Sequence, residues 1–282
     1  ALDEFAQLHH DSFGGDGYVS VEVAPSLAHD GPGTEAAARA LHEQIDRPNL
    51  MVKIPGTVEG LAAIRRMIAE GRNINVTLIF SLDRYQQVMD AYIDGLEEYA
   101  GTVDADLAHV ASVASFFISR VDSEVDARLD AIGTPEALAL RGKAAIAQAK
   151  LAYHAFRHTF SGARWEALAA DGAVVQRPLW ASTSTKNPAY PDTLYVDELI
   201  GPDTVNTLPD ATIEAFAHHG TSARTIDEGV SHAELVWRQL AEVGVDMDDV
   251  ADKLERDGVA SFQKSFDDLL EALAAKADEL RN

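Results

Sequence analysis

The 282-residue sequence contains no cysteine, and this absence excludes several kinds of site. Without thiols the chain forms no disulfide, no cysteine nucleophile and no thiolate metal site. No apolar run approaches the roughly 18–20 residues that a membrane span needs. The first fifteen residues, ALDEFAQLHHDSFGG, have neither the basic start nor the apolar stretch of a signal peptide. We therefore expect a cytoplasmic globular protein without a metal or cofactor that does not enter the membrane.

Basic residues are also scarce. The chain has 23 Lys and Arg against 46 Asp and Glu, which gives a formal net charge of −23. A surface of this charge repels nucleic acid and anionic membranes, because both are bound through clustered Lys and Arg. A phosphate site in such a protein depends on a few local cations or backbone N–H groups. The hydrophobic content of 46% is enough for a sizeable core.

Short apolar segments alternate with longer stretches of helical spacing. This pattern predicts parallel βαβ units, and the last third of the chain is helical throughout. A doubly wound sheet and a (β/α)8 TIM barrel both fit the alternation, but no glycine-rich G-x-G-x-x-G follows a strand, so we prefer the barrel in a single domain over 1–282. The predicted strands are 17–25, 49–56, 73–81, 109–120, 176–184 and 203–209.

Six strands are two fewer than a closed barrel of this type requires. An open barrel would leave two unpaired edges and an exposed core. We therefore expect these strands to be the third to the eighth of the barrel, with the first two in an N-terminal portion that the sequence does not contain.

Lys53 lies in the middle of the apolar strand NLMVKIP. Burial disfavours the ammonium form and lowers a lysine pKa, and a neutral amine is what condensation with a carbonyl needs. Lys53 is thus a candidate Schiff-base residue. The alternatives are a lysine that reaches solvent from a strand end and a structural ion pair.

Polar side chains gather toward the carboxyl ends of the other predicted strands. Glu22 is a second charge in an apolar strand, either a partner for Lys53 or a proton carrier. Asn75 and Thr77 are two apart and so point the same way, which suits a polyhydroxylated substrate or a bond between strands. Ser115 and Ser182 occupy comparable places on later strands.

Two cations are candidates for binding phosphate. Arg120 ends an apolar run and can grip phosphate with its planar guanidinium, unless it pairs with Asp122 or Glu124. Lys186 follows the hydroxyl-rich segment ASTST, where backbone and side-chain donors also favour an anion.

These segments resemble the transaldolase family in its longer bacterial form. VSVEV, MVKIPGTVEGL, NINVTLIFS, SVASFFISRVD and RPLWASTSTKNPAYPDTLYVDELIGPDTVNTLP match its blocks in order, across essentially the whole chain. The resemblance implies a metal-free class I aldolase-type barrel of the pentose phosphate pathway. Such an enzyme moves a dihydroxyacetone unit from sedoheptulose 7-phosphate to glyceraldehyde 3-phosphate, giving erythrose 4-phosphate and fructose 6-phosphate.

The resemblance also implies roles for individual residues. Lys53 would form the imine, Glu22 and Thr77 would hold the catalytic water, and Asn75 and Ser115 would bind substrate hydroxyls. Arg120 would bind phosphate. Ser182 matches a phosphate-site serine, and Lys186 would supply the charge of an arginine that the family often has where Ser184 stands.

The chain departs from the family at the first two strands. The family's acid/base aspartate on the first strand and its TNP-type loop on the second have no counterpart here. Two other functions therefore stay open: a truncated barrel that only binds sugar phosphate, and an aldolase that cleaves fructose 6-phosphate. The oligomeric state, including a homo-oligomer, is also open.

Overall fold

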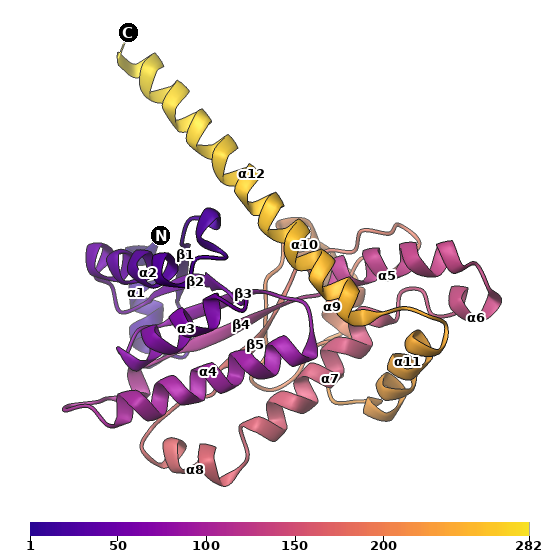
Figure 1. The fold of residues 1–282 in the computed structure, drawn as a ribbon, viewed down its shortest axis with the longest axis horizontal. Coiled ribbons are helices and arrows are strands. Elements are labelled where there is room, and N and C mark those ends of the chain that lie inside the picture. The colour runs from indigo at the N-terminus through magenta and orange to yellow at the C-terminus, as the bar shows by residue number, and fades with distance from the viewer. Residues whose placement is uncertain (282) are drawn as a thin grey trace.

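The computed structural model describes residues 1–281 and contains one curled parallel sheet (Figure 1). Its six strands follow one another in chain order from β1 to β6, and every neighbouring pair is parallel. Each predicted strand is confirmed. The strands are β1 Val19–Glu22, β2 Leu50–Pro55, β3 Ile74–Ile79, β4 Ser112–Phe117, β5 Arg177–Ala181 and β6 Val205–Asn206.

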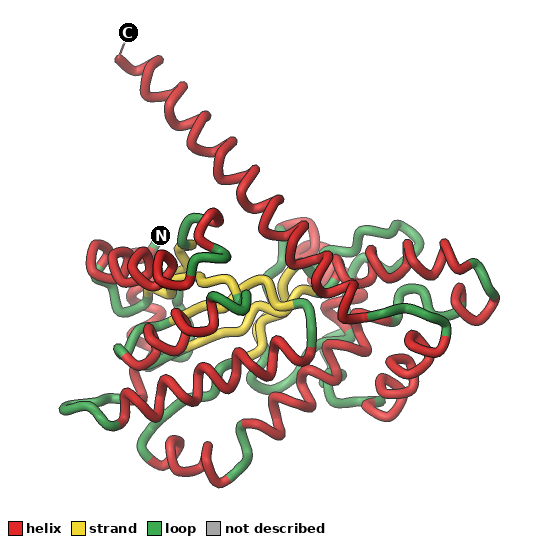
Figure 2. Tube along the Cα trace, viewed as in Figure 1, coloured by secondary structure: helices red, strands yellow, loops and turns green. Residues whose placement is uncertain are grey.

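Helices surround the sheet (Figure 2), as the βαβ pattern predicts. No helix within residues 1–281 is both long and apolar enough to cross a membrane. The helices are α1 Leu2–Asp11, α2 Gly31–Ile45, α3 Gly60–Ala69, α4 Leu82–Ala100, α5 Ser119–Ile132, α6 Pro135–Leu138, α7 Ala144–Thr159, α8 Ala163–Ala170, α9 Leu194–Asp197, α10 Asp210–His219, α11 Val230–Glu242 and α12 Met247–Arg281, with short 3-10 turns η1 Pro25–Leu27 and η2 Leu107–His109.

The two faces of the sheet differ because side chains alternate along each strand. Val52, Ile54 and Val76 are fully buried and belong to the main apolar core, to which the outer helices also contribute. The alternate positions turn to the concave side. Strands β1 and β6 each pair with one neighbour only, so the sheet described by residues 1–281 is a curled half-barrel.

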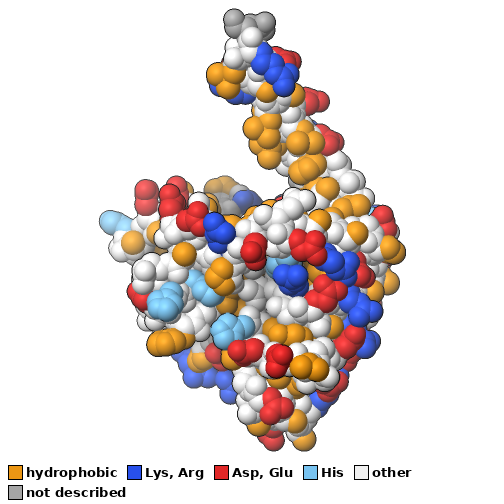
Figure 3. All heavy atoms as spheres, turned by 90° about the vertical axis from the view of Figure 1, so that its left-hand side faces the viewer, with side chains coloured by type: hydrophobic (Ala, Val, Ile, Leu, Met, Phe, Trp, Pro, Cys, Tyr) orange, Lys and Arg blue, Asp and Glu red, His pale blue; other side chains and the backbone are white. Residues whose placement is uncertain are grey.

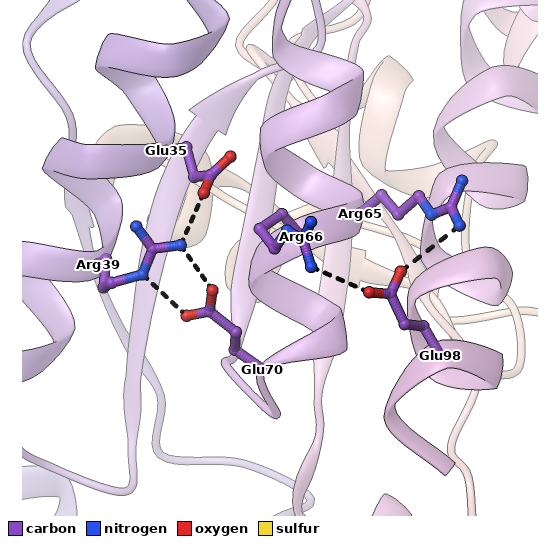
Figure 4. Close-up of polar contacts among 6 residues, drawn as sticks. All are labelled: Glu35, Arg39, Arg65, Arg66, Glu70 and Glu98. Carbon is purple, nitrogen blue, oxygen red and sulfur yellow. Dashed lines mark hydrogen bonds and ion pairs between the residues drawn. The ribbon is translucent and has the colours of Figure 1, made fainter. Parts of the chain in front are cut away.

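Ion pairs join the outer helices at the surface (Figure 4). Arg39 on α2 binds both Glu35 and Glu70, with nitrogen–oxygen distances of 2.7 and 2.6 Å. The carboxylate of Glu98 on α4 lies 3.4 Å from Arg65 and 3.0 Å from Arg66, both on α3. Since surface pairs contribute little individually, the packing of α2, α3 and α4 rests mainly on their buried apolar faces.

The last helix, α12, has two distinct halves (Figure 1). Its first half packs against α5, η1 and the end of β3. Arg128 on α5 lies 2.7 Å from Asp249, and Lys253 lies 3.1 Å from Glu124. Its second half projects from the body toward the C-terminus.

Candidate active site

The concave face of the sheet encloses a hollow of about 690 Å³. The alternation that buries one face against helices brings every second residue of the strands into this space. Four predicted site residues on three strands, and a fifth at the end of β1, thus line one cavity. The lining residues include Ser20, Glu22, Met51, Lys53, Asn75, Thr77, Val113, Ser115, Phe117, Arg177, Leu179, Ala181, Val205 and Thr207.

Lys53 and Glu22 form an ion pair inside this hollow. Their Cα atoms are partners in the register of β1 and β2, so the two strands place the side chains side by side. The Lys53 side chain is 22% exposed, in a strand whose other residues are all buried. The structural ion pair considered from the sequence is therefore present, and it also gives the lysine an adjacent proton acceptor.

A chain of hydrogen bonds runs beside the pair. Ser115 donates its hydroxyl proton to Asn75 Oδ1 at 2.8 Å, and the Asn75 amide donates to Ser20 Oγ at 3.0 Å. The hydroxyl of Thr77 is buried and has no hydrogen-bond partner among residues 1–281. A buried hydroxyl without a partner is costly, so Thr77 is prepared to bind a water molecule or a substrate oxygen.

An irregularity in β3 follows Thr77 directly. The register between β3 and β4 shifts between Val76 and Ile79, and Leu78 has a positive φ of 60°. Bulges of this kind redirect side chains and occur next to active sites. As a result Thr77 and its neighbour Leu78 both line a small apolar pocket above Lys53, which a regular strand would not allow.

Arg120 lies in the first turn of α5, immediately after β4. Its guanidinium carbon is 5.2 Å from the centre of the Phe117 ring. Neither Asp122 nor Glu124 pairs with it: Asp122 accepts from Tyr195, and Glu124 binds Arg128 and Lys253. Burial lowers the pKa of Arg120, although a guanidinium remains charged at neutral pH. A half-buried cation that pairs with no carboxylate of residues 1–281 suits an anion.

The structure places the remaining two predicted residues apart from the concave hollow. Ser182 has a φ of 58°, and its hydroxyl lies 3.0 Å from that of Ser119, beside Arg120. Its carbonyl accepts the backbone N–H of Ser119, which fixes the start of α5. Lys186 is exposed and donates to Ser184 at 2.6 Å.

Sequence reasoning missed the aromatic residues of the site. The Phe117 ring packs against the guanidinium of Arg120. Phe262 and Phe266 on α12 line a cavity that is also lined by Glu22. The spacing of Phe262 and Phe266 indicates one helix face, but it does not say what that face covers. Arg177 also lines the hollow. Its position at the start of a predicted strand did not indicate a function.

Known transaldolase sequences match this chain over nearly its whole length. The sequence model described as Transaldolase/Fructose-6-phosphate aldolase matches residues 2–273. A transaldolase of Parafrankia sp. (strain EAN1pec) is 56% identical over 97% of this chain and 74% of its own length. One from Thermobifida fusca is 54% identical over 97% of the chain and 74% of its own length. One from Mycolicibacterium smegmatis is 52% identical over 99% and 75%.

The residues that the family model matches, 2–273, include the segments that build the cavity, from Glu22 on β1 to Thr207 after β6. A match of this extent cannot come from the sheet architecture alone, because one fold hosts many unrelated activities. The chain belongs to the transaldolase/fructose-6-phosphate aldolase family.

Proposed function

We propose that this chain is a transaldolase that transfers a dihydroxyacetone unit between sugar phosphates through an imine on Lys53. The observation that carries the proposal is the Lys53–Glu22 ion pair inside a polar hollow formed by adjacent strands. The reaction belongs to the pentose phosphate pathway, and we place it in the cytoplasm. Its substrates are phosphorylated ketoses and aldoses.

The first step is condensation of the Lys53 amine with the ketose carbonyl. Glu22 takes the ammonium proton, the free amine attacks the carbonyl carbon, and loss of water leaves an imine. In our proposal Glu22 and the unpartnered hydroxyl of Thr77 hold that water. The positions of both groups around Lys53 support this assignment.

Bond cleavage then releases the aldose and leaves a three-carbon enamine on Lys53. The enamine attacks the carbonyl of an acceptor aldose, and hydrolysis of the new imine frees the product. In this scheme Asn75 and Ser115 bind substrate hydroxyls, because their amide and hydroxyl groups form hydrogen bonds and line the hollow. Cleavage also needs a base for a substrate hydroxyl proton, and the family pattern assigns that role to an aspartate on a strand outside these six.

Arg120 binds the phosphate group in this proposal. Its guanidinium is half-buried and stacked on Phe117, and no carboxylate of residues 1–281 forms an ion pair with it. Ser182 supports the same region through Ser119 at the start of α5. Lys186 lies in the loop after β5 and is bonded to Ser184, so we assign it a secondary role in attracting the anion.

We further propose that the half-barrel is part of a closed (β/α)8 barrel. The unpaired edges of β1 and β6 support this, since each exposes backbone groups that two further parallel strands would satisfy. The strands present here are then the third to the eighth.

Trapping of the imine tests the proposal. The protein is incubated with fructose 6-phosphate and borohydride, digested, and analysed by mass spectrometry. We expect a reduced three- or six-carbon adduct on the peptide that contains Lys53, and none in Lys53→Met. An active enzyme with an adduct elsewhere, or with none, would refute the mechanism.

The family description favours one second activity, cleavage of fructose 6-phosphate without an acceptor. Rates with and without erythrose 4-phosphate separate transfer from simple cleavage. Binding of sugar phosphate without turnover or adduct would instead support a non-catalytic barrel, and the intact mass of the same preparation, compared with 30.4 kDa, would show whether the tested chain is the one described.

A further inference from the structure

We infer that Phe262 on α12 covers the active site. It is a positioning residue that shields the Lys53 imine from water and holds Arg120 in place. The inference rests on the proposed Lys53 chemistry. The six strands build the site, and this inference adds α12, which follows all of them in the sequence.

The ring of Phe262 lies near both cations of the site. Lys53 Nζ is 5.8 Å from its centre, and the guanidinium carbon of Arg120 is 6.0 Å from its centre. Arg120 therefore has two aromatic rings near its guanidinium, Phe117 and Phe262. An aromatic face attracts a cation at such distances, and the attraction grows when water is excluded.

The same ring lines the cavities beside the reactive amine. Phe262 and Val259 line the small pocket that contains Glu22, Lys53 and Thr77. Phe262 also lines an adjoining cavity with Glu22 and Arg120. One side chain thus lines both the pocket beside the amine and the adjoining cavity beside the predicted phosphate arginine.

The approach of α12 to the sheet depends on a glycine one turn earlier. Gly258 is buried, and a Cβ at this position would lie 2.9 Å from Leu78 Cδ2 and 3.6 Å from the Phe80 ring. The missing side chain lets the helix axis pass close to the end of β3. Phe262 lies four residues later, so it falls on the same face of the helix, above Lys53.

One ion pair joins this part of α12 to the body. Glu255, half-buried, lies 4.0 Å from Arg84, and Arg84 donates to the carbonyl of Gly56 just after β2. This contact links the helix to the strand that carries Lys53. Leu270 and Leu273, farther along the helix, are exposed. Figure 3 shows hydrophobic side chains on the part of α12 that projects from the body.

Shielding matters because the imine has two fates. When water adds to the imine carbon, the carbon–nitrogen bond breaks, the ketone leaves and Lys53 returns as the amine. Transfer requires the three-carbon intermediate to persist until an acceptor aldose arrives. A ring that excludes water therefore favours transfer over release.

The test measures the lifetime of the imine directly. Dihydroxyacetone forms an imine on Lys53 without any carbon–carbon cleavage, so the full reaction is not needed. After dilution, samples are quenched with borohydride at intervals and the Lys53 adduct is quantified. We expect Phe262→Ala to lose the imine at least about threefold faster than wild type. Phe262→Tyr retains the ring and should behave as wild type. Leu270→Ala, on the projecting half of the helix, is the matched control and should be unchanged.

A second measurement does not depend on imine chemistry. Labelling of Lys53 by a small amine-reactive reagent is compared with labelling of exposed Lys264 in the same molecule. The ratio should rise in Phe262→Ala and not in Leu270→Ala. An unchanged labelling ratio and an unchanged imine lifetime in Phe262→Ala would overturn the inference that Phe262 covers Lys53. If wild type forms no imine, the proposed function fails, and the labelling ratio still decides whether Phe262 covers Lys53.

Discussion

Glu22 and Lys53 are register partners on adjacent parallel strands, and their side chains form an ion pair in the concave hollow. In a parallel sheet such partners point to the same face, so the pairing follows from the backbone register. A one-residue slip of β1 would turn Glu22 toward the core and leave the lysine alone. The register of β1 and β2 is thus part of the proposed chemistry.

The first prediction concerns Glu22→Gln. Glutamine has nearly the same shape but accepts no proton, so the variant lacks the adjacent base that takes a proton from the Lys53 amine. We expect kcat to fall by about 10²–10⁴-fold. Steady-state kinetics with fructose 6-phosphate and erythrose 4-phosphate measure it. Glu59→Gln, on an exposed carboxylate that contacts His29, is the control. A kcat within twofold of wild type would remove Glu22 from the mechanism.

The second prediction concerns Arg120. Replacing it with Met keeps an apolar stem but removes the charge that binds phosphate. The loss of a charge-assisted contact of about 1.5–3 kcal/mol raises KM for fructose 6-phosphate by about 10- to 100-fold.

Imine formation with dihydroxyacetone, which has no phosphate, separates this effect from a general loss of structure. It should change little in Arg120→Met. An exposed arginine, Arg65, provides the control variant Arg65→Met, for which KM should stay constant. If Arg120→Met impaired imine formation with dihydroxyacetone as much as it impaired activity with fructose 6-phosphate, Arg120 would have a structural role instead.

Much of the site could be predicted because its residues lie on strands. The alternation of side chains in NLMVKIP and NINVTLIFS determines which residues share a face, and the structure confirms that Lys53, Asn75 and Thr77 line one hollow. The order of the six parallel strands follows from the alternation of strand and helix.

The remaining features depend on contacts that no local pattern encodes. Phe262 reaches the site only because α12 crosses the end of β3, more than 170 residues away in sequence. The bulge at Leu78 adds a non-glycine residue with positive φ that the apolar run does not signal. Lys186 is a candidate because of its place after ASTST, and the structure shows it exposed in the loop after β5 and bonded to Ser184, so its role in binding an anion stays a prediction.

The third prediction concerns Gly60, the first residue of α3. A Cβ there would lie 2.0 Å from the carbonyl oxygen of Pro55 at the end of β2, and that backbone atom cannot move without disturbing the strand of Lys53. Gly60→Ala should therefore lower the free energy of unfolding by about 3 kcal/mol. Denaturant unfolding measures the difference. Gly162 has no atom within 4 Å of the corresponding position, so Gly162→Ala should cost less than about 1 kcal/mol. Similar losses in both variants would contradict the predicted clash.

The last prediction concerns the pH dependence of stability through Asp122. Its carboxylate is buried, where it accepts hydrogen bonds from the Tyr195 hydroxyl at 2.7 Å and the backbone N–H of Ala145 at 2.8 Å. Burial raises the pKa of Asp122 from 3.8 to about 6, more than these hydrogen bonds lower it. The folded protein therefore holds this proton more tightly than the unfolded chain does.

The sign of the effect follows from that difference. As pH rises from about 4 to above 6, the unfolded chain ionises first, so the contribution of Asp122 to stability falls by about 3 kcal/mol. Asp122→Asn has no proton to lose and keeps an oxygen for Ala145. The unfolding free energy of wild type minus that of Asp122→Asn should therefore decrease across this range, and the other titrating groups cancel in the difference. Denaturant unfolding at pH 4, 5, 6 and 7 measures it. A difference that stays constant with pH would show that the pKa of Asp122 is the same in the folded and the unfolded protein, and that its two donors offset its burial.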